Sequence, residues 1–251
     1  MTDILLNGCL GKMGRVIIDS VSQRDDCRIV AGVDYKKTEE AFPFPVYDSF
    51  ENVTEKADVI IDFSNPAALT GLLKYAKYKK TPLVIATTGL SDEQISAIDD
   101  TASKIPVFFT ANMSIGVNLI CELAKKAASV LYPDYNIEII EQHHNQKLDA
   151  PSGTALMLAN EISSVLPEKV DYEYNRHDKR EKRPTAEIGI HSIRGGTIVG
   201  EHEVIFAGKD EIVKISHSAM SKEIFANGAI NASIYLKDKK PGLYSMKDML
   251  A

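Results

Sequence analysis

Short apolar runs alternate with helical patterns in the first part of the chain, up to about residue 110. Runs of this kind, bounded by turn residues, are typical of strands that are buried on both faces. We expect strands at 4–7, 28–34, 57–63, 82–87 and 106–110. Helix starts lie between them, at Pro66 and at a capping box from Ser91 to Gln94. This order predicts an α/β fold with a Rossmann-type, doubly wound parallel sheet, which binds ligands at the carboxyl ends of its strands.

The pattern changes near residue 112, and strands then predominate. Helical patterns cover 114–132 and 154–165, and strand patterns lie at 136–143, 185–193, 196–207 and 211–217. Glycine turns at 194–196 and 208–210 are typical of hairpins, and the charged segment 172–183 is expected to be an exposed loop. We therefore predict a second, α+β domain with a mixed sheet, followed by a last helix at 221–236.

The composition narrows the possible functions. The chain has 251 residues and a net charge of −6, from 29 Lys and Arg against 35 Asp and Glu, so nucleic acid is not an expected partner. Its longest uncharged stretch, 105–121, is interrupted by Pro106 and polar residues and is not expected to span a membrane. The first residues lack the basic region of a secretory signal, which predicts a cytoplasmic location. Cys9, Cys27 and Cys121 lie far apart, so we expect them to be reduced and structural.

Three glycines follow the first expected strand. Gly8, Gly11 and Gly14 form a GxxGxxG pattern at the start of an expected helix. Such a turn lets a pyrophosphate approach the backbone at the positive end of the helix dipole. Asp34 ends the second strand, 20 residues after Gly14, where its carboxylate can accept hydrogen bonds from a ribose diol. The pattern predicts a dinucleotide site rather than an empty structural turn.

The residues after Asp34 leave the choice of dinucleotide open. A carboxylate repels a 2′-phosphate and therefore favours NADH. Lys36 and Lys37 follow at once and can offset that charge, or they can belong to a solvated loop. Two further loops, 86–89 and 110–113, follow expected strands at the same edge of the sheet, where their backbones can hold nicotinamide.

The densest group of reactive side chains lies between residues 141 and 154. His143, His144 and Lys147 supply proton donors, and Ser152-Gly153-Thr154 opens a helix whose free amides suit a carboxylate. Neighbouring side chains on an extended chain point in opposite directions, so at most one histidine faces a given substrate atom. No cysteine or paired carboxylate lies nearby in the sequence to complete a metal site, and no metal is expected. The block predicts an anion-binding, proton-donating loop, although alone it is also compatible with a strand end and a helix cap.

The segment EQHHNQKLDAPSGTA resembles the hallmark of the 4-hydroxy-tetrahydrodipicolinate reductases, also called dihydrodipicolinate reductases, of bacterial lysine and diaminopimelate synthesis. Segments along nearly the whole chain resemble the family in the same order: NGCLGKMG, DFSNP, ATTGLS, TANMSIGVN, RGGTIVGEHEVIFAG, FANGAINA and GLYSMKDML. The resemblance implies a Rossmann-type dinucleotide-binding domain of 1–113 and 222–251. It also implies a substrate-binding domain of 114–221 that assembles a homotetramer.

The resemblance further implies roles for single residues. His143 is implied as the proton donor or acceptor, Lys147 as a second proton donor and His144 as a substrate contact, with Gly153 and Thr154 as a cradle for a substrate carboxylate. Around NADH or NADPH, the family pattern places Gly8, Cys9, Leu10, Gly11, Lys12, Met13, Asp34, Ala86, Thr87, Thr88, Thr110, Ala111, Asn112 and Met113.

The implied reaction is the reduction of 4-hydroxy-tetrahydrodipicolinate to tetrahydrodipicolinate by NAD(P)H, with release of water. A small dicarboxylate substrate matches the cationic and amide donors of the block at 141–154. Two alternatives stay open. Another two-domain amino-acid dehydrogenase would share the glycine turn but not HHNQKLDAPSGTA, and a non-catalytic dinucleotide-sensing protein would have no need of acids such as His143 and Lys147.

Overall fold

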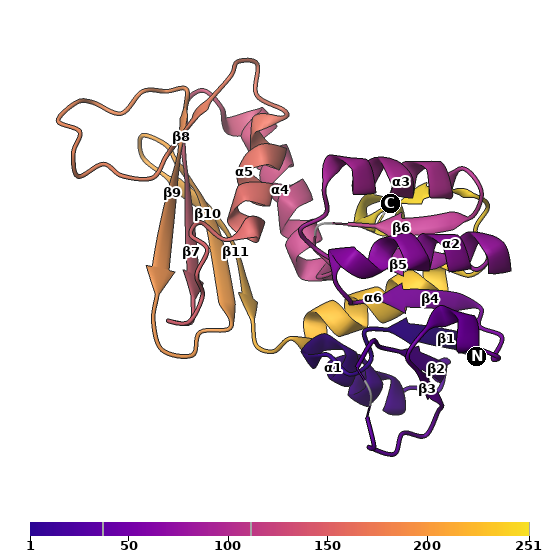
Figure 1. Cartoon of the computed structure of the whole chain (residues 1–251). Coiled ribbons are helices and arrows are strands. Elements are labelled where there is room, and N and C mark those ends of the chain that lie inside the picture. Colours follow the sequence, from indigo (N-terminus) through magenta and orange to yellow (C-terminus); the bar gives the residue numbers. More distant parts are fainter. Residues whose placement is uncertain (37, 111, 251) are drawn as a thin grey trace. The chain divides into compact units, whose positions relative to one another are not determined.

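The computed structural model of the chain describes residues 1–36, 38–110 and 112–250 (Figure 1). The chain forms two compact units, Met1–Ser114 with Lys222–Ala251, and Ile115–Ser221. The C-terminal segment therefore completes the first unit. The chain enters the second unit at Ile115, one residue after the expected start at residue 114. No helix in the described part of the chain is both long and apolar enough to cross a membrane.

The first unit is built on a seven-stranded sheet in the order β12-β6-β5-β4-β1-β2-β3. Every pair of neighbouring strands is parallel. The strands are β1 (Thr2–Asn7), β2 (Cys27–Val33), β3 (Val46–Tyr47), β4 (Val59–Asp62), β5 (Leu83–Ile85), β6 (Pro106–Phe109) and β12 (Gly242–Tyr244). The order is that of a Rossmann-type sheet with one added strand, β12, which confirms the predicted fold class. β3 and β12 were not expected from the sequence.

Helices cover the sheet of the first unit. They are α1 (Lys12–Ser22), α2 (Leu69–Lys79), α3 (Asp92–Ala102), α6 (Glu223–Leu236) and α7 (Met246–Leu250), with short 3-10 turns at Phe50–Asn52 and Pro66–Ala68. Helices α2 and α3 share one buried core with the strands, in which Leu72 and Ile98 lie with Ile60. Helix α6 packs against α1 and against β4, β5 and β6. The predicted capping box is present, with Ser91 and Gln94 each bonded to the other's backbone.

The second unit contains a mixed, five-stranded sheet in the order β11-β10-β7-β9-β8. Its strands are β7 (Asn136–His143), β8 (Asp171–Glu173), β9 (Glu187–Arg194), β10 (Gly200–Ala207) and β11 (Ile212–Ala219). Strand β10 is antiparallel to β7 and β11, whereas β9 is parallel to β7 and β8. The mixed sheet of the prediction is confirmed.

Two expectations for the second unit were wrong in part. The turn at 194–196 does not form a hairpin, because β7 lies between β9 and β10 in the sheet. The turn at 208–210 does form one, between β10 and β11, and the amide of Gly208 donates to the carbonyl of Glu211 over 2.9 Å. The expected loop at 172–183 begins later, because Tyr172 and Glu173 belong to the edge strand β8.

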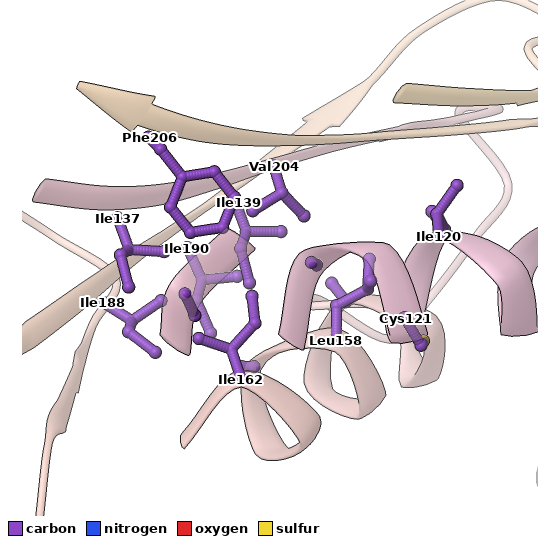
Figure 2. Close-up of a cluster of buried hydrophobic side chains, with 14 of the residues drawn as sticks. Ile120, Cys121, Ile137, Ile139, Leu158, Ile162, Ile188, Ile190, Val204 and Phe206 are labelled. Carbon is purple, nitrogen blue, oxygen red and sulfur yellow. The ribbon is translucent and has the colours of Figure 1, made fainter. Parts of the chain in front are cut away.

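The core of the second unit lies between one face of the sheet and two helices, α4 (Ile115–Leu131) and α5 (Gly153–Ser163). Side chains alternate along a strand, so every second residue of β7 and β10 faces these helices. Figure 2 shows this core, with Ile137, Ile139, Ile188, Ile190, Val204 and Phe206 from the sheet and Ile120, Cys121, Leu158 and Ile162 from the helices. The core holds the end of β7 and the start of α5 in fixed positions.

Candidate functional site

The predicted glycine turn joins β1 to α1 in the first unit, and two of its glycines are needed by the fold itself. Gly8 has a φ of +82°, and a Cβ there would lie 2.5 Å from the carbonyl oxygen of Phe63. A Cβ on Gly14 would overlap the carbonyl oxygen of Gly8. The turn is therefore compact, and its backbone is closely packed against the segment after β4.

Gly11 has a different part in the same turn. It is the N-cap residue of α1, and no side chain there bonds the first amides of the helix. A Cβ on Gly11 would meet only the carbonyl oxygen of Gly8, at 3.2 Å. The start of α1 thus presents backbone amides at the positive end of the helix dipole, which suits a pyrophosphate.

Asp34 lies at the end of β2, beside the glycine turn. Its carboxylate accepts the amide of Leu10 at 3.0 Å and the amide of Lys36 at 3.1 Å. Each carboxylate oxygen retains a further lone pair for a ribose hydroxyl. A cleft of about 390 Å³ lies here, lined by Gly8, Gly11 and Asp34 among others. The residues present therefore fit the adenosine part of a dinucleotide.

Asp62 joins the carboxyl ends of three neighbouring strands. Its carboxylate accepts the side-chain amide of Asn7, the last residue of β1, at 2.7 Å, the hydroxyl of Ser64 at 2.6 Å and the hydroxyl of Thr87 after β5 at 2.7 Å. Burial raises the pKa of Asp62, and these hydrogen bonds oppose that rise. The loop at 86–89 is thereby fixed against the end of β4.

Several residues expected around the dinucleotide have buried side chains. Cys9, Thr87 and Met113 are buried, and burial raises the pKa of the Cys9 thiol to about 12. These residues can reach a cofactor only through their backbones. The hydroxyl of Thr110 accepts the amide of Asn112 at 3.4 Å. The residues that line the cleft at Asp34 include none from the loops at 86–89 and 110–113. Ala111, and also Lys37 beside Asp34, lie outside the described residues.

The proton-donating block of the second unit runs from the end of β7 to the start of α5. The side chain of His143 is 12% exposed, and its Nδ1 lies 2.6 Å from Oε2 of Glu141. Lys147 forms an ion pair with Asp149 at 2.9 Å. Ser152 caps α5 by accepting the amide of Ala155 at 3.2 Å. The unit therefore brings His143 and Lys147 into one short segment with the helix start.

The remaining predicted residues of the block lie beside this helix start. Gly153 and Thr154 are the first two residues of α5. A Cβ built on Gly153 would have no heavy atom within 4 Å, apart from its chain neighbours and the backbone of its own helix. The Nδ1 atom of His144 is buried and has no hydrogen-bond partner among the described residues. A helix start with open space beside it suits a carboxylate. No group of three metal-ligating side chains occurs in the described ranges.

Three residues that the sequence reasoning did not assign surround His143. Glu141 is fully buried and accepts both terminal nitrogens of Arg194, at 2.6 and 2.8 Å. The ring of His202 meets the ring of His143 edge to face, at 5.2 Å between centroids. Glu141 gave a signal in the sequence, because the alternation of 136–143 places its carboxylate in the row that faces the core. Arg194 and His202 belong to the segment RGGTIVGEHEVIFAG, which resembles the family, but nothing in the sequence indicated that they lie beside His143, because their strands reach β7 only through the register of the sheet.

Two family models together match nearly the whole chain. The model described as dihydrodipicolinate reductase, N-terminus, matches residues 2–113. The model described as dihydrodipicolinate reductase, C-terminus, matches residues 116–250. The two matches meet where the chain passes from the first unit to the second, and the second match continues through the returning C-terminal segment.

Individual relatives give the same result. The chain is 51% identical over 253 residues to 4-hydroxy-tetrahydrodipicolinate reductase of Clostridium novyi (strain NT), and the match covers 100% of this chain and 98% of the relative. It is 50% identical over 252 residues, with the same coverage, to the reductase of that name from Caldanaerobacter subterraneus subsp. tengcongensis. The structure of dipicolinate-bound dihydrodipicolinate reductase from Paenisporosarcina sp. TG-14 matches with a TM-score of 0.83 at 28% identity, over 100% of both chains.

Proposed function

The chain belongs to the dihydrodipicolinate reductase family, and from this premise we propose that it reduces 4-hydroxy-tetrahydrodipicolinate to tetrahydrodipicolinate with NAD(P)H. Water is released, and the reaction belongs to the diaminopimelate route to lysine. The observation that carries the proposal is the block at 141–154. It combines a histidine paired with a carboxylate, a lysine and an open helix start within one segment.

The dinucleotide would be held by the first unit. The backbone from Gly8 to Met13 would receive the pyrophosphate, Asp34 the adenosine ribose, and the loops at 86–88 and 110–113 the nicotinamide end. When bound, the dihydronicotinamide supplies a hydride. Asp34 favours NADH, whereas Lys36, whose ammonium lies 5.7 Å from the Tyr35 ring centroid, can offset the charge of a 2′-phosphate. Both dinucleotides therefore enter the test.

The second unit would bind the substrate and supply the proton. The amides at Gly153 and Thr154 and the cation of Lys147 suit the two carboxylates of a cyclic dicarboxylate, and His144 supplies a further contact. His143 would deliver the proton that the ring requires after reduction, with Lys147 as a second donor. The ring of His143 can exchange its proton with solvent, because its side chain is 12% exposed.

We also propose that the protein is a cytoplasmic homotetramer assembled by its second unit, as the family resemblance implies. Cys9, Cys27 and Cys121 are buried and form no disulfide, which suits a compartment that keeps thiols reduced. Burial raises the pKa of Cys27 to about 11, so this thiol is unreactive at neutral pH. Light scattering of the purified protein tests the proposal, since a mass of one chain would contradict it.

The decisive experiment follows the loss of dihydronicotinamide absorbance with freshly generated 4-hydroxy-tetrahydrodipicolinate. NADH and NADPH are compared for the wild type, for His143→Ala and for the control His177→Ala, which removes an exposed histidine of the second unit. We expect kcat to fall by about 100-fold or more in His143→Ala, with unchanged dinucleotide affinity and an unaffected control. Tight dinucleotide binding without turnover in the wild type would instead favour a sensing protein.

A further inference from the structure

A carboxylate occupies a core position at the end of β7. The row of β7 side chains that faces the helices is Ile137, Ile139, Glu141 and His143, and the first three are buried. Glu141 has no exposed side-chain surface. Burying a carboxylate costs free energy unless charged and hydrogen-bonding groups surround it, so the neighbours of Glu141 must offset this cost.

Glu141 is surrounded by donors on both oxygens. The Nη2 atom of Arg194 donates to Oε1 at 2.6 Å and Nη1 donates to Oε2 at 2.8 Å, while the amide of Ser152 donates to Oε1 at 3.1 Å. Arg194 also donates to the carbonyl of Asp149 at 2.7 Å. Burial alone would raise the pKa of Glu141, but the hydrogen bonds from Arg194 and His143 outweigh it and hold the pKa at about 2. Glu141 is therefore ionised at neutral pH.

An ionised Glu141 determines how the ring of His143 must lie. A carboxylate can only accept hydrogen bonds, so Nδ1 of His143, 2.6 Å from Oε2, must carry a hydrogen and donate it. The Nε2 atom is then the ring nitrogen left for a substrate. It faces Gly200 of β10, where a Cβ would lie only 3.0 Å away. The absence of a side chain at Gly200 leaves room at the reactive side of the ring.

A second histidine lies beside His143 and is held neutral. His202 lies edge to face with His143, and its Nε2 is 2.9 Å from the hydroxyl of Ser152. Burial, together with the nearness of His143, lowers the pKa of His202 to about 4. His202 is thus neutral at neutral pH. Of the two neighbouring rings, it is that of His143 that contacts the ionised carboxylate.

We propose that Glu141, held in place by Arg194, is the positioning residue for His143. It fixes the ring with Nδ1 toward the carboxylate and Nε2 toward the substrate, and it stabilises the imidazolium from which the proton is delivered. Neither Glu141 nor Arg194 needs to touch the substrate for this. The inference rests on the proposed function, because it gives His143 its role as proton donor.

The test replaces the carboxylate by an amide of the same shape. In Glu141→Gln the amide oxygen takes the Oε1 place, which faces two donors, Arg194 and the amide of Ser152. The amide nitrogen then takes the Oε2 place, where it can donate to Nδ1 of His143. Nη1 of Arg194 loses its acceptor there and keeps only the carbonyl of Ile193. We expect the neutral ring of His143 to change from the Nδ1–H to the Nε2–H tautomer, seen in its ¹⁵N chemical shifts. We also expect kcat to fall about 100-fold with KM nearly unchanged.

The same strand offers a matched control. Glu138 of β7 contacts the guanidinium of Arg183 at 2.9 Å and the ring of His191 at 2.9 Å. Glu138→Gln therefore weakens another Glu-Arg-His cluster of the same sheet without touching His143. We expect it to leave the tautomer of His143 unchanged and kcat within about twofold of the wild type. A purely structural effect of losing a charge in this sheet would appear in both variants.

The outcomes separate this inference from the proposed function. A wild type without reductase activity contradicts the function, whereas an active wild type with an unchanged tautomer or unchanged kcat in Glu141→Gln contradicts the inference. If that variant does not fold, Arg194→Lys replaces it. Lysine keeps the charge but cannot donate to both carboxylate oxygens in the same planar geometry, so we expect kcat to fall about tenfold. A kcat equal to that of the wild type in this variant would overturn the proposal.

Discussion

His202 is a buried histidine of β10, the strand that lies between β7 and β11. In the register of the sheet it lies opposite Glu141 of β7 and His217 of β11, and the ring of His143 is its neighbour. Burial and the nearness of His143 lower its pKa from 6.5 to about 4. The folded protein therefore holds His202 neutral at pH values at which the unfolded chain already binds a proton there.

This difference predicts how stability depends on pH. The unfolded state binds more protons than the folded state between about pH 6.5 and about pH 4, so the free energy of unfolding falls as the pH falls through this window. The shift corresponds to about 3 kcal/mol. In His202→Gln the stability should fall less over this window. The remaining loss should come from His217, whose pKa burial also lowers, and at the acid end from carboxylates with a lowered pKa such as Glu141. Urea unfolding of the variant at several pH values measures it.

The control for this prediction is His177→Gln. His177 is exposed, and the change should leave the pH dependence of the wild type intact. Glu141 and Lys147 also face His202, and the low pKa of Glu141 lowers the stability as the pH falls below about 5.5, so the contribution of His202 is read between pH 6.5 and about pH 5.5. An unchanged slope between pH 6.5 and pH 4 in His202→Gln would show that this ring does not set the acid stability.

At the scale of elements, the position of α6 depends on a single glycine. A Cβ on Gly228 would overlap the carbonyl oxygen of Met113, in the segment after β6. Helix α6 packs against β4, β5 and β6, so it cannot move away without opening this core. Gly228→Ala should lower the free energy of unfolding by about 3 kcal/mol, measured by thermal and urea unfolding.

Gly71 of α2 supplies the comparison. No heavy atom lies within 4 Å of a Cβ built there, apart from the chain around it, and its φ is not positive. Gly71→Ala should therefore stabilise the protein by up to about 1 kcal/mol, because alanine favours a helix over glycine. Equal effects of the two substitutions would mean that helix propensity, rather than the close approach to Met113, decides both.

The elements differ in how far the sequence reveals them. Strand β7 (Asn136–His143) was predicted with both of its bounds, because its isoleucines at 137, 139 and 140 favour a strand and polar residues lie at both ends of the segment. The missed strands β3, β8 and β12 have two or three residues each, too few for a period to appear. They are strands because a neighbouring strand supplies hydrogen bonds, as β6 does for β12. Short edge strands of this kind depend on the assembled sheet.

The candidate site also has a part that the sequence reveals and a part that depends on the assembled sheet. The residues of the block at 141–154 lie in one segment, so their chemistry could be read from their order along the chain. Arg194 and His202 lie about fifty and about sixty residues after His143 in the sequence and come close to it because β9 and β10 flank β7. A hairpin expected at 194–196 would have placed β9 beside β10. Only the order of the strands in the sheet brings the arginine to Glu141.

At the scale of the whole molecule, the two units differ in their continuity. The second unit is one uninterrupted segment, Ile115–Ser221, with its own core between the sheet and α4 and α5. The first unit is made from two segments, and its sheet is incomplete until Lys222–Ala251 has been added. That segment supplies the edge strand β12 and the helix α6, whose Ala226, Ala229 and Ile230 are fully buried.

Removal of residues 222–251 should therefore unfold one unit and spare the other. Without α6 the strands β4, β5 and β6 lose apolar cover on one face, and burial of such side chains contributes about 25 cal/mol for each Å² removed from water. Hydrogen exchange measured by mass spectrometry should show β1, β4 and β5 exchanging freely, while β7, β9 and β10 stay protected. Protection of β4 in the truncated protein would contradict this, because it would mean that the first sheet is stable without its second segment.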